Sequence, residues 1–241
     1  MNGREQLQYT LNWLRPHCMP GKTKVRIGSK NDGGYVLVDD LSRITAVMSF
    51  GIGDNVDFDL HFAELGTKVF QFDHTIDSLP VEHKNFVHHR VMVGRRDGMP
   101  LRKTLDTCGL LGSKTLLLKC DIEGSEWGLL EKADSTDLSH FEQILIELHD
   151  FETLSDPVSL DHAFRTLEKI NRTHCVVHVH GNNNCSPTRV HGLSLCPVVE
   201  VTYVRRDLGA LVPSWEEFPS ALDTPNNTGW GDIPLGTFTY V

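Results

Sequence analysis

An apolar run that stops in a cluster of carboxylates is the feature that most constrains this chain. Leu116–Leu118 lead through Lys119 and Cys120 into Asp121 and Glu123. Three successive apolar residues suit a strand buried on both faces of a parallel sheet, and the acids then fall at its carboxyl end, where ligands sit in open α/β sheets. Buried carboxylates need a cation, a hydroxyl or backbone donors. The alternative interpretation is an acidic first helical turn, stabilised by the helix dipole.

Strand and helix patterns alternate along most of the chain. Strands are expected at 46–50, 68–72, 85–93, 115–120, 143–148, 174–180 and 198–205. Helices are expected at 56–65, 101–108, 125–132 and 157–170. Such alternation predicts an α/β fold with a parallel sheet and crossover helices. No convincing helix separates the last two strands, which predicts an antiparallel pair at the end.

The remaining segments extend this core into one domain over residues 1–241. Residues 1–40 are expected to form an amphipathic helix at 4–15 and a hairpin-like cap around paired glycines, because glycine permits positive φ. Residues 41–205 form the Rossmann-like core. Residues 206–241 are rich in turn-forming residues and predict an irregular tail.

Charge and composition narrow the partners. The chain holds 32 acidic and 23 basic residues, a net charge of −9, which disfavours nucleic acid. No apolar run is long enough to span a bilayer and no signal-peptide core is apparent, so we expect a soluble, cytoplasmic or otherwise intracellular protein. The six cysteines show no C-x-x-C pairing and suit a reducing compartment. No apolar stripe indicates an oligomeric state.

A second ligand signal follows the first core strand. Gly51 and Gly53 would let a ligand approach the backbone closely, but Val56 stands where a dinucleotide fingerprint has its third glycine. Asp73 ends the next strand, about 20 residues on, where a carboxylate can accept both ribose hydroxyls. The alternative for Asp73 is a cap of a turn. Together these residues predict a nucleoside-bearing ligand without a diphosphate.

These motifs resemble a known family. Gly51-Ile-Gly53, Asp73 and Lys119-Cys-Asp-Ile-Glu-Gly-Ser-Glu126 are similar to the FkbM-type methyltransferases that use S-adenosyl-L-methionine. Segments 26–35 and 222–227 resemble related methyltransferase-like proteins. The resemblance implies a Rossmann-like class I methyltransferase sheet of seven strands, mostly parallel with an antiparallel last strand, and helices on both faces. It also implies methyl transfer to oxygen. Cys120 departs from the larger aliphatic residue that the family more often has.

The resemblance also implies roles for individual residues. Gly51 and Gly53 would lie against the methionine portion of the cofactor, Asp73 would hold the ribose, and Asp121 would sit near the sulfonium. The turn that contains the paired glycines would close over the cofactor from the amino-terminal side, through Asp32, Gly33 and Gly34.

Methyl transfer to a hydroxyl needs a group that takes the proton of the acceptor. The candidates fall at predicted strand ends: Asp121, Glu123, Glu147, His149 and His180. His149 is the preferred base because the ordinary pKa of histidine lies close to neutral pH. Asp121 and Glu123 are the other catalytic candidates. A surface histidine at a strand end is the alternative interpretation of His149.

Two further hypotheses concern a metal and the acceptor. Asp121, Glu147 and His149 could hold Mg²⁺ or Mn²⁺, because mixed oxygen and nitrogen ligands suit these ions, and the metal would acidify the acceptor hydroxyl. His180, Asn182 and Asn183 offer donors and acceptors that suit a polyhydroxylated substrate. An asparagine-rich turn is the alternative.

The sequence therefore predicts an S-adenosyl-L-methionine-dependent O-methyltransferase acting on a sugar, glycan or similar small polyhydroxylated acceptor. One alternative is an NAD(P)-dependent oxidoreductase, which would need the missing third glycine. The other is a non-catalytic binding module on a methyltransferase fold.

Overall fold

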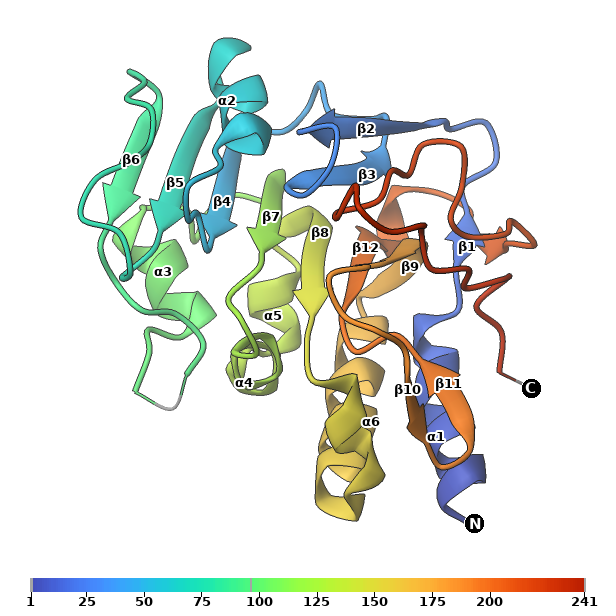
Figure 1. Cartoon of the computed structure of the whole chain (residues 1–241). Helices are drawn as coiled ribbons and strands as arrows, with labels where there is room; N and C mark the ends of the chain where they lie inside the picture. The colour runs from blue at the N-terminus through green and yellow to red at the C-terminus, as the bar shows by residue number, and fades with distance from the viewer. Residues whose placement is uncertain (1, 96, 241) are drawn as a thin grey trace.

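The computed structural model describes residues 2–95 and 97–240. The fold is built around a central β-sheet (Figure 1). Within these residues the sheet has seven strands in the order β6-β5-β4-β7-β8-β12-β9. The strands are β4 (Ala46–Phe50), β5 (Lys68–Phe72), β6 (Phe86–His89), β7 (Leu116–Cys120), β8 (Phe141–Leu148), β9 (His174–Gly181) and β12 (Val199–Arg205).

The strand directions confirm a mostly parallel sheet. The pairs β4–β5, β4–β7, β5–β6 and β7–β8 are all parallel. Strand β12 is antiparallel to both β8 and β9, between which it lies. The expected antiparallel pair at the end of the chain is therefore present, and the last strand is reversed against two neighbours. This arrangement fits a Rossmann-like α/β fold.

Helices cover both faces of the sheet. They are α1 (Gly3–Leu11), α2 (Asp57–Glu64), α3 (Leu101–Thr107), α4 (Glu126–Lys132), α5 (Ser135–Leu138) and α6 (Pro157–Asn171), with short 3-10 turns η1 (Asn12–Leu14), η2 (Phe151–Ser155) and η3 (Arg206–Leu208). Because successive strand side chains point to opposite faces, Leu116 and Leu118 join the cluster that includes α1, α3, α4 and α6. Leu117 joins the cluster on the other face, with α2.

A hairpin completes the second face. Strands β2 (Lys24–Gly28) and β3 (Gly34–Val38) pair antiparallel, as predicted. The hairpin is tied to the sheet by polar side chains. Gln143 of β8 both accepts from the Val38 N–H and donates to its carbonyl, each at 2.9 Å. Thr202 of β12 donates to the Val36 carbonyl at 2.6 Å. These bonds place the turn between β2 and β3 beside the carboxyl ends of the strands.

Several boundaries differ from the sequence prediction. The extended segment at 85–93 forms strand only to His89, because its partner β5 ends at Phe72, opposite His89. The predicted helix at 4–15 becomes α1 and η1, and α1 packs against α6, where Tyr9 stacks on Phe164 at 5.6 Å. Short elements that we did not predict are α5 and the pairs β10 (Thr188–Val190)–β11 (Leu193–Leu195) and β1 (His17–Cys18)–β13 (Val212–Pro213).

The C-terminal tail is irregular but closely bound to the sheet (Figure 1). Phe218 and Phe238 are buried in the main core. His178 of β9 bonds to Asp223 at 2.8 Å, and His180 bonds to Asp232 at 3.0 Å. The tail is thus an integral part of the structure. Among the described residues, no helix has the length and apolarity needed to cross a membrane.

Candidate functional site

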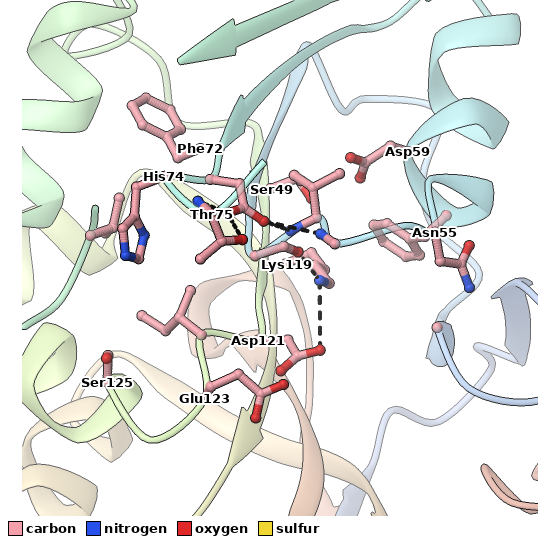
Figure 2. Close-up of a pocket in the computed structure, with 18 of the residues that line it drawn as sticks. Ser49, Asn55, Asp59, Phe72, His74, Thr75, Lys119, Asp121, Glu123 and Ser125 are labelled. Atoms are coloured by element: carbon pink, nitrogen blue, oxygen red, sulfur yellow. Dashed lines mark hydrogen bonds and ion pairs between the residues drawn. The ribbon is translucent and has the colours of Figure 1, made fainter. Parts of the chain in front are cut away.

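A cavity of about 590 Å³ lies at the carboxyl ends of β4, β5 and β7 (Figure 2). The four residues that carry the ligand prediction all line it: Gly51, Gly53, Asp73 and Asp121. Asp32 and Gly33 also line it, from the turn between β2 and β3. The cavity therefore collects residues from distant parts of the chain at the edge where open α/β sheets bind ligands.

The two glycines of the loop after β4 have different tasks. Gly51 has φ +76°, and a Cβ there would lie 1.6 Å from the Asp121 carbonyl oxygen, so only glycine allows the ends of β4 and β7 to approach. Gly53 has φ +57°, and its Cβ position has no atom within 4 Å among the described residues. Gly51 therefore serves the fold, whereas Gly53 leaves open backbone beside the cavity.

Asp73 is bound by the glycine loop itself. Its Oδ2 accepts from the N–H groups of Ile52 (2.8 Å) and Gly53 (3.0 Å). Its Oδ1 accepts from the N–H (2.7 Å) and hydroxyl (2.6 Å) of Thr75. Burial alone would raise the pKa of Asp73, but these donors outweigh it and lower the pKa to about 2. Asp73 thus fixes the loop conformation, and its contact with a ribose stays a prediction.

Lys119 connects the glycine loop to β7. It is buried, and its Nζ donates to the Gly51 carbonyl and lies 3.8 Å from Asp121 Oδ2. The same ammonium lies 5.9 Å from the centre of the Tyr35 ring. Figure 2 shows Lys119 beside Asp121, with Glu123 next to them. Sequence reasoning did not select Lys119 as a site residue, although a lysine inside an apolar strand was an available signal.

Asp121, Glu123 and His149 come together at the ends of β7 and β8. Their ligand atoms all lie within 4.8 Å of one another, and His149 Nε2 is 3.5 Å from Glu123 Oε2. Asp121 is partly exposed to the cavity, whereas the Glu123 side chain is mostly exposed to solvent. The structure thus brings together three residues that we predicted at strand ends. His149 itself does not line the cavity.

The surroundings of His149 differ from the expected near-neutral base. Burial opposes its charged form, but the hydrogen bond and charge of Glu126, together with Glu147 and Asp121, raise the pKa of His149 to about 9. Its Nδ1 lies 3.3 Å from the buried Glu126 Oε1. Trp127 donates to the His149 carbonyl at 2.8 Å and helps to fix the strand end. His149 is thus an imidazolium at neutral pH.

Glu147 lies apart from this group. It accepts from Asn182 Nδ2 at 2.7 Å and is 3.9 Å from His149. Burial, and then the charges of Asp121 and Glu200, raise the pKa of the Glu147 carboxyl well above its usual range. Because its carboxyl is buried and already accepts from Asn182, Glu147 is poorly placed to bind a metal. The three-residue group in the structure contains Glu123 in the place that we gave to Glu147.

The predicted substrate residues lie under the tail. His180 is buried between Glu200 (3.1 Å) and Asp232 (3.0 Å), and although burial opposes its charge, these acids and Asp223 raise its pKa to about 9. Asn183 donates to the Asn227 carbonyl at 2.9 Å. Neither residue lines the cavity, nor does Asn182. Gly34 starts β3 and also lies outside the lining, unlike its neighbour Gly33.

Tyr35 is the lining residue that sequence reasoning missed most clearly. It directly follows the paired glycines, so its position next to a ligand-closing turn was the available signal.

No protein-family model matches the chain, and a search of curated proteins found no match. The fold and the cavity define the class of this protein: an α/β protein with a Rossmann-like sheet and a ligand cavity at the carboxyl edge of its strands.

Proposed function

We propose that this chain is an S-adenosyl-L-methionine-dependent O-methyltransferase whose acceptor is a hydroxyl of a sugar, glycan or similar small polyhydroxylated molecule. The observation that carries the proposal is the convergence of Gly51, Gly53, Asp73 and Asp121 on one cavity. The sheet around it has seven described strands with the last one antiparallel, which is the arrangement that the resemblance to FkbM-type methyltransferases implies.

The residues of the cavity suit this cofactor. Its volume falls in the range of small-molecule sites, roughly 300–1,000 Å³. Gly53 exposes backbone to the ligand, and Val56 in place of a third glycine suits a nucleoside that carries no diphosphate. Val91, Met92 and Ile122 add apolar wall, and Asp121 adds a negative charge that suits a sulfonium.

The chain supplies orientation and a proton acceptor. When bound, the cofactor provides an electrophilic methyl group, which leaves sulfur as the acceptor oxygen forms the new bond. Asp121 faces the cavity and is the best-placed group to take the hydroxyl proton on a carboxylate oxygen. His149 carries its own proton at neutral pH, so we assign it the positioning of Glu123 and Asp121 in place of the base role.

A divalent metal is a second candidate mechanism, favoured by one observation. Asp121, Glu123 and His149 offer two carboxylates and, once a metal displaces the proton of His149, one imidazole, and their atoms lie within 4.8 Å of one another. This mixed set suits Mg²⁺ or Mn²⁺, which would acidify an acceptor hydroxyl. Dialysis against a chelator distinguishes the two mechanisms: the metal candidate predicts loss of turnover and recovery with Mn²⁺, and the carboxylate mechanism predicts an unchanged rate.

Transfer of a labelled methyl group tests the function. Purified protein is incubated with labelled S-adenosyl-L-methionine and a library of released glycans and free sugars, and products are followed by mass spectrometry. We expect acceptors that gain one methylene in mass, and a rate of gain about 100-fold lower for the Asp121→Asn variant. The matched control Asp161→Asn removes an exposed ion pair with Arg165, on α6, and keeps full activity. Labelling of the acceptor at the wild-type rate in Asp121→Asn contradicts the assigned role of Asp121.

The rival functions predict other results. An NAD(P)-dependent oxidoreductase would bind a dinucleotide in the cavity, and nothing in the loop at Gly51 and Gly53 supplies the third glycine. A non-catalytic module would bind S-adenosyl-L-methionine without turning over any acceptor. The retained cavity with Asp121 facing it favours the enzyme.

A further inference from the structure

The Tyr35 hydroxyl takes no part in the proposed mechanism. Tyr35 lines the cavity but is only 4% exposed, and its ring packs edge-on against Phe58 at 5.6 Å. Burial and then four carboxylates raise the pKa of Tyr35 well above its usual value, and no hydrogen bond within the described residues contributes. A hydroxyl that lines the cavity and has no hydrogen-bond partner among the described residues is free to bond to a ligand.

Four carboxylates from separate segments contribute to the raised pKa of Tyr35. They are Asp32 of the β2–β3 turn, Asp121 after β7, Glu147 of β8 and Glu200 of β12. Glu147 and Glu200 face each other across the β8–β12 pair. Of these four residues, Asp32 and Asp121 line the cavity together with Tyr35. Because carboxylates accept hydrogen bonds and repel anions, a ligand beside them has to donate hydrogen bonds and to carry no negative charge.

Asn226 of the tail gives an independent sign of the same requirement. It is 7% exposed, and its Nδ2 donates both to Asp32 Oδ1 (3.1 Å) and to Glu200 Oε1 (2.7 Å). Its Oδ1 is buried and has no hydrogen-bond partner within the described residues. A second acceptor that lacks a donor therefore lies beside Asp32, next to the cavity wall.

The nearby cations are already engaged by protein groups. Lys119 donates to the Gly51 carbonyl, and Arg95 donates to the Ser125 hydroxyl at 3.2 Å. His180 lies between Glu200 and Asp232, and His149 lies against Glu126 and Glu123. Lys119 also pairs with Asp121 at 3.8 Å, and His180 offsets Glu200. The cavity nevertheless keeps an excess of negative charge, because its described lining holds Lys119 and Arg95 against six acidic residues: Asp32, Asp54, Asp59, Asp73, Asp121 and Glu123.

We propose that Tyr35, Asp32 and Asp121 form a subsite for a neutral or amino-bearing polyol, which rejects the same polyol when it carries a carboxylate, phosphate or sulfate. The subsite takes hydroxyl or ammonium donors on its carboxylates and on the Tyr35 oxygen. Its assignment to the methyl acceptor rests on the proposed function. That assignment restricts the acceptor to uncharged sugars and amino sugars.

Saturation-transfer NMR with three matched probes tests the subsite. Glucose, glucosamine and glucuronic acid share one ring and differ in charge. We expect glucose and glucosamine to bind, and glucuronic acid to bind at least tenfold more weakly. Tyr35→Phe keeps the ring packed on Phe58 and removes the hydroxyl, so it weakens binding of glucose about tenfold. Asp32→Asn removes a negative charge, so we expect it to reduce the difference in binding affinity between glucuronic acid and glucose.

Asp161→Asn removes an equal charge far from the cavity and leaves all three affinities unchanged. Equal binding of glucuronic acid and glucose, an unchanged affinity in Tyr35→Phe, or no binding of any probe overturns the subsite. Binding of S-adenosyl-L-methionine is measured separately by calorimetry. Its absence, with selective sugar binding intact, overturns the proposed function and leaves the subsite standing.

Discussion

Asp73 and Asp121 each follow a strand of the sheet, but their carboxylates make very different contacts. Asp73, after β5, has both oxygens occupied by hydrogen bonds from Ile52, Gly53 and Thr75. For the Asp121 side chain, after β7, the contact within the described residues is an ion pair with Lys119, at 3.8 Å. Both line the same cavity. The strand-end position alone does not decide whether an acid organises the backbone or stays available to a ligand.

The difference arises from the backbone that follows each strand. Gly51 and Gly53 adopt positive φ, so the loop turns its N–H groups toward Asp73. After β7, Glu123 and Gly124 adopt positive φ, and the Ile122 N–H is taken by Glu126 at 2.7 Å. Asp121 thereby loses a local donor to Glu126. We infer that Asp73, at the end of β5, stabilises the glycine loop, and that Asp121, at the end of β7, remains available to take part in the reaction.

The largest effect is expected from Gly51→Ala. Its Cβ would collide with the Asp121 carbonyl at 1.6 Å, and both atoms are held by backbone pairing of β4 and β7. We expect the free energy of unfolding to fall by more than about 4 kcal/mol, an exceptional loss for one substitution. Gly53→Ala is the matched control, because its Cβ has free space and costs only about 1–2 kcal/mol of backbone strain. Urea unfolding of both variants measures the difference, and equal losses would contradict the assigned tasks.

Asp121→Asn is expected to lower kcat about 100-fold, within the range for loss of a group that takes a proton. Its affinity for S-adenosyl-L-methionine should change less than kcat, because the backbone is unaltered. Glu123→Gln serves as the comparison. Its side chain is 84% exposed, so we expect less than a tenfold change. Steady-state kinetics on both variants sharpens the comparison, and a larger loss in Glu123→Gln would reverse the two roles.

Asp73→Asn should act mainly on the glycine loop. The amide keeps one acceptor and loses the charge that four donors stabilise, so we expect a loss of about 2 kcal/mol in unfolding free energy. A lowered pKa means that the Asp73 contribution is complete above pH 3.9 and is lost as the pH falls toward 2. Wild type and variant should therefore converge in stability at low pH. A constant gap between pH 6 and pH 2 would contradict this account.

The smallest effect concerns His149 and alkaline pH. Its pKa, raised to about 9, means that the folded state keeps a proton that the unfolded chain loses near pH 6.5. The stabilisation is therefore complete below pH 6.5 and is lost as the pH rises through 9. We expect stability to fall less between pH 7 and pH 9.5 in His149→Gln than in wild type, measured with a chelator present. His180, with a similar pKa, is unchanged in both proteins.

The sequence was sufficient to predict the framework of the fold. Uninterrupted apolar runs such as Leu116–Leu118 indicate buried parallel strands. Because parallel strands end at the same edge of the sheet, Gly53 after β4 and Asp121 after β7 both line the cavity there. The position of β12 between β8 and β9 was not predictable, because local patterns carry no information on sheet order. Short elements such as α5 and β10–β11 were missed since a few residues give no clear periodicity.

The candidate site shows a similar limit. Motif spacing correctly predicted that Asp73 and Asp121 lie at the cavity. The pKa values of His149 and Glu147 depend on burial and on neighbouring charges, which the local sequence does not reveal. His180 and Asn183 resembled substrate residues, and in the structure they bond to the tail. Their partner residues in the tail lie 52 and 44 positions away in the chain, beyond the reach of local sequence patterns.

Calorimetric titration with S-adenosyl-L-methionine, run beside NAD, tests the central claim most directly. We expect saturable, one-site binding of S-adenosyl-L-methionine with a dissociation constant in the micromolar range, no heat with NAD, and loss of binding when a bulky side chain replaces Gly53. The absence of heat at high micromolar S-adenosyl-L-methionine, or tighter binding of NAD, would contradict the account.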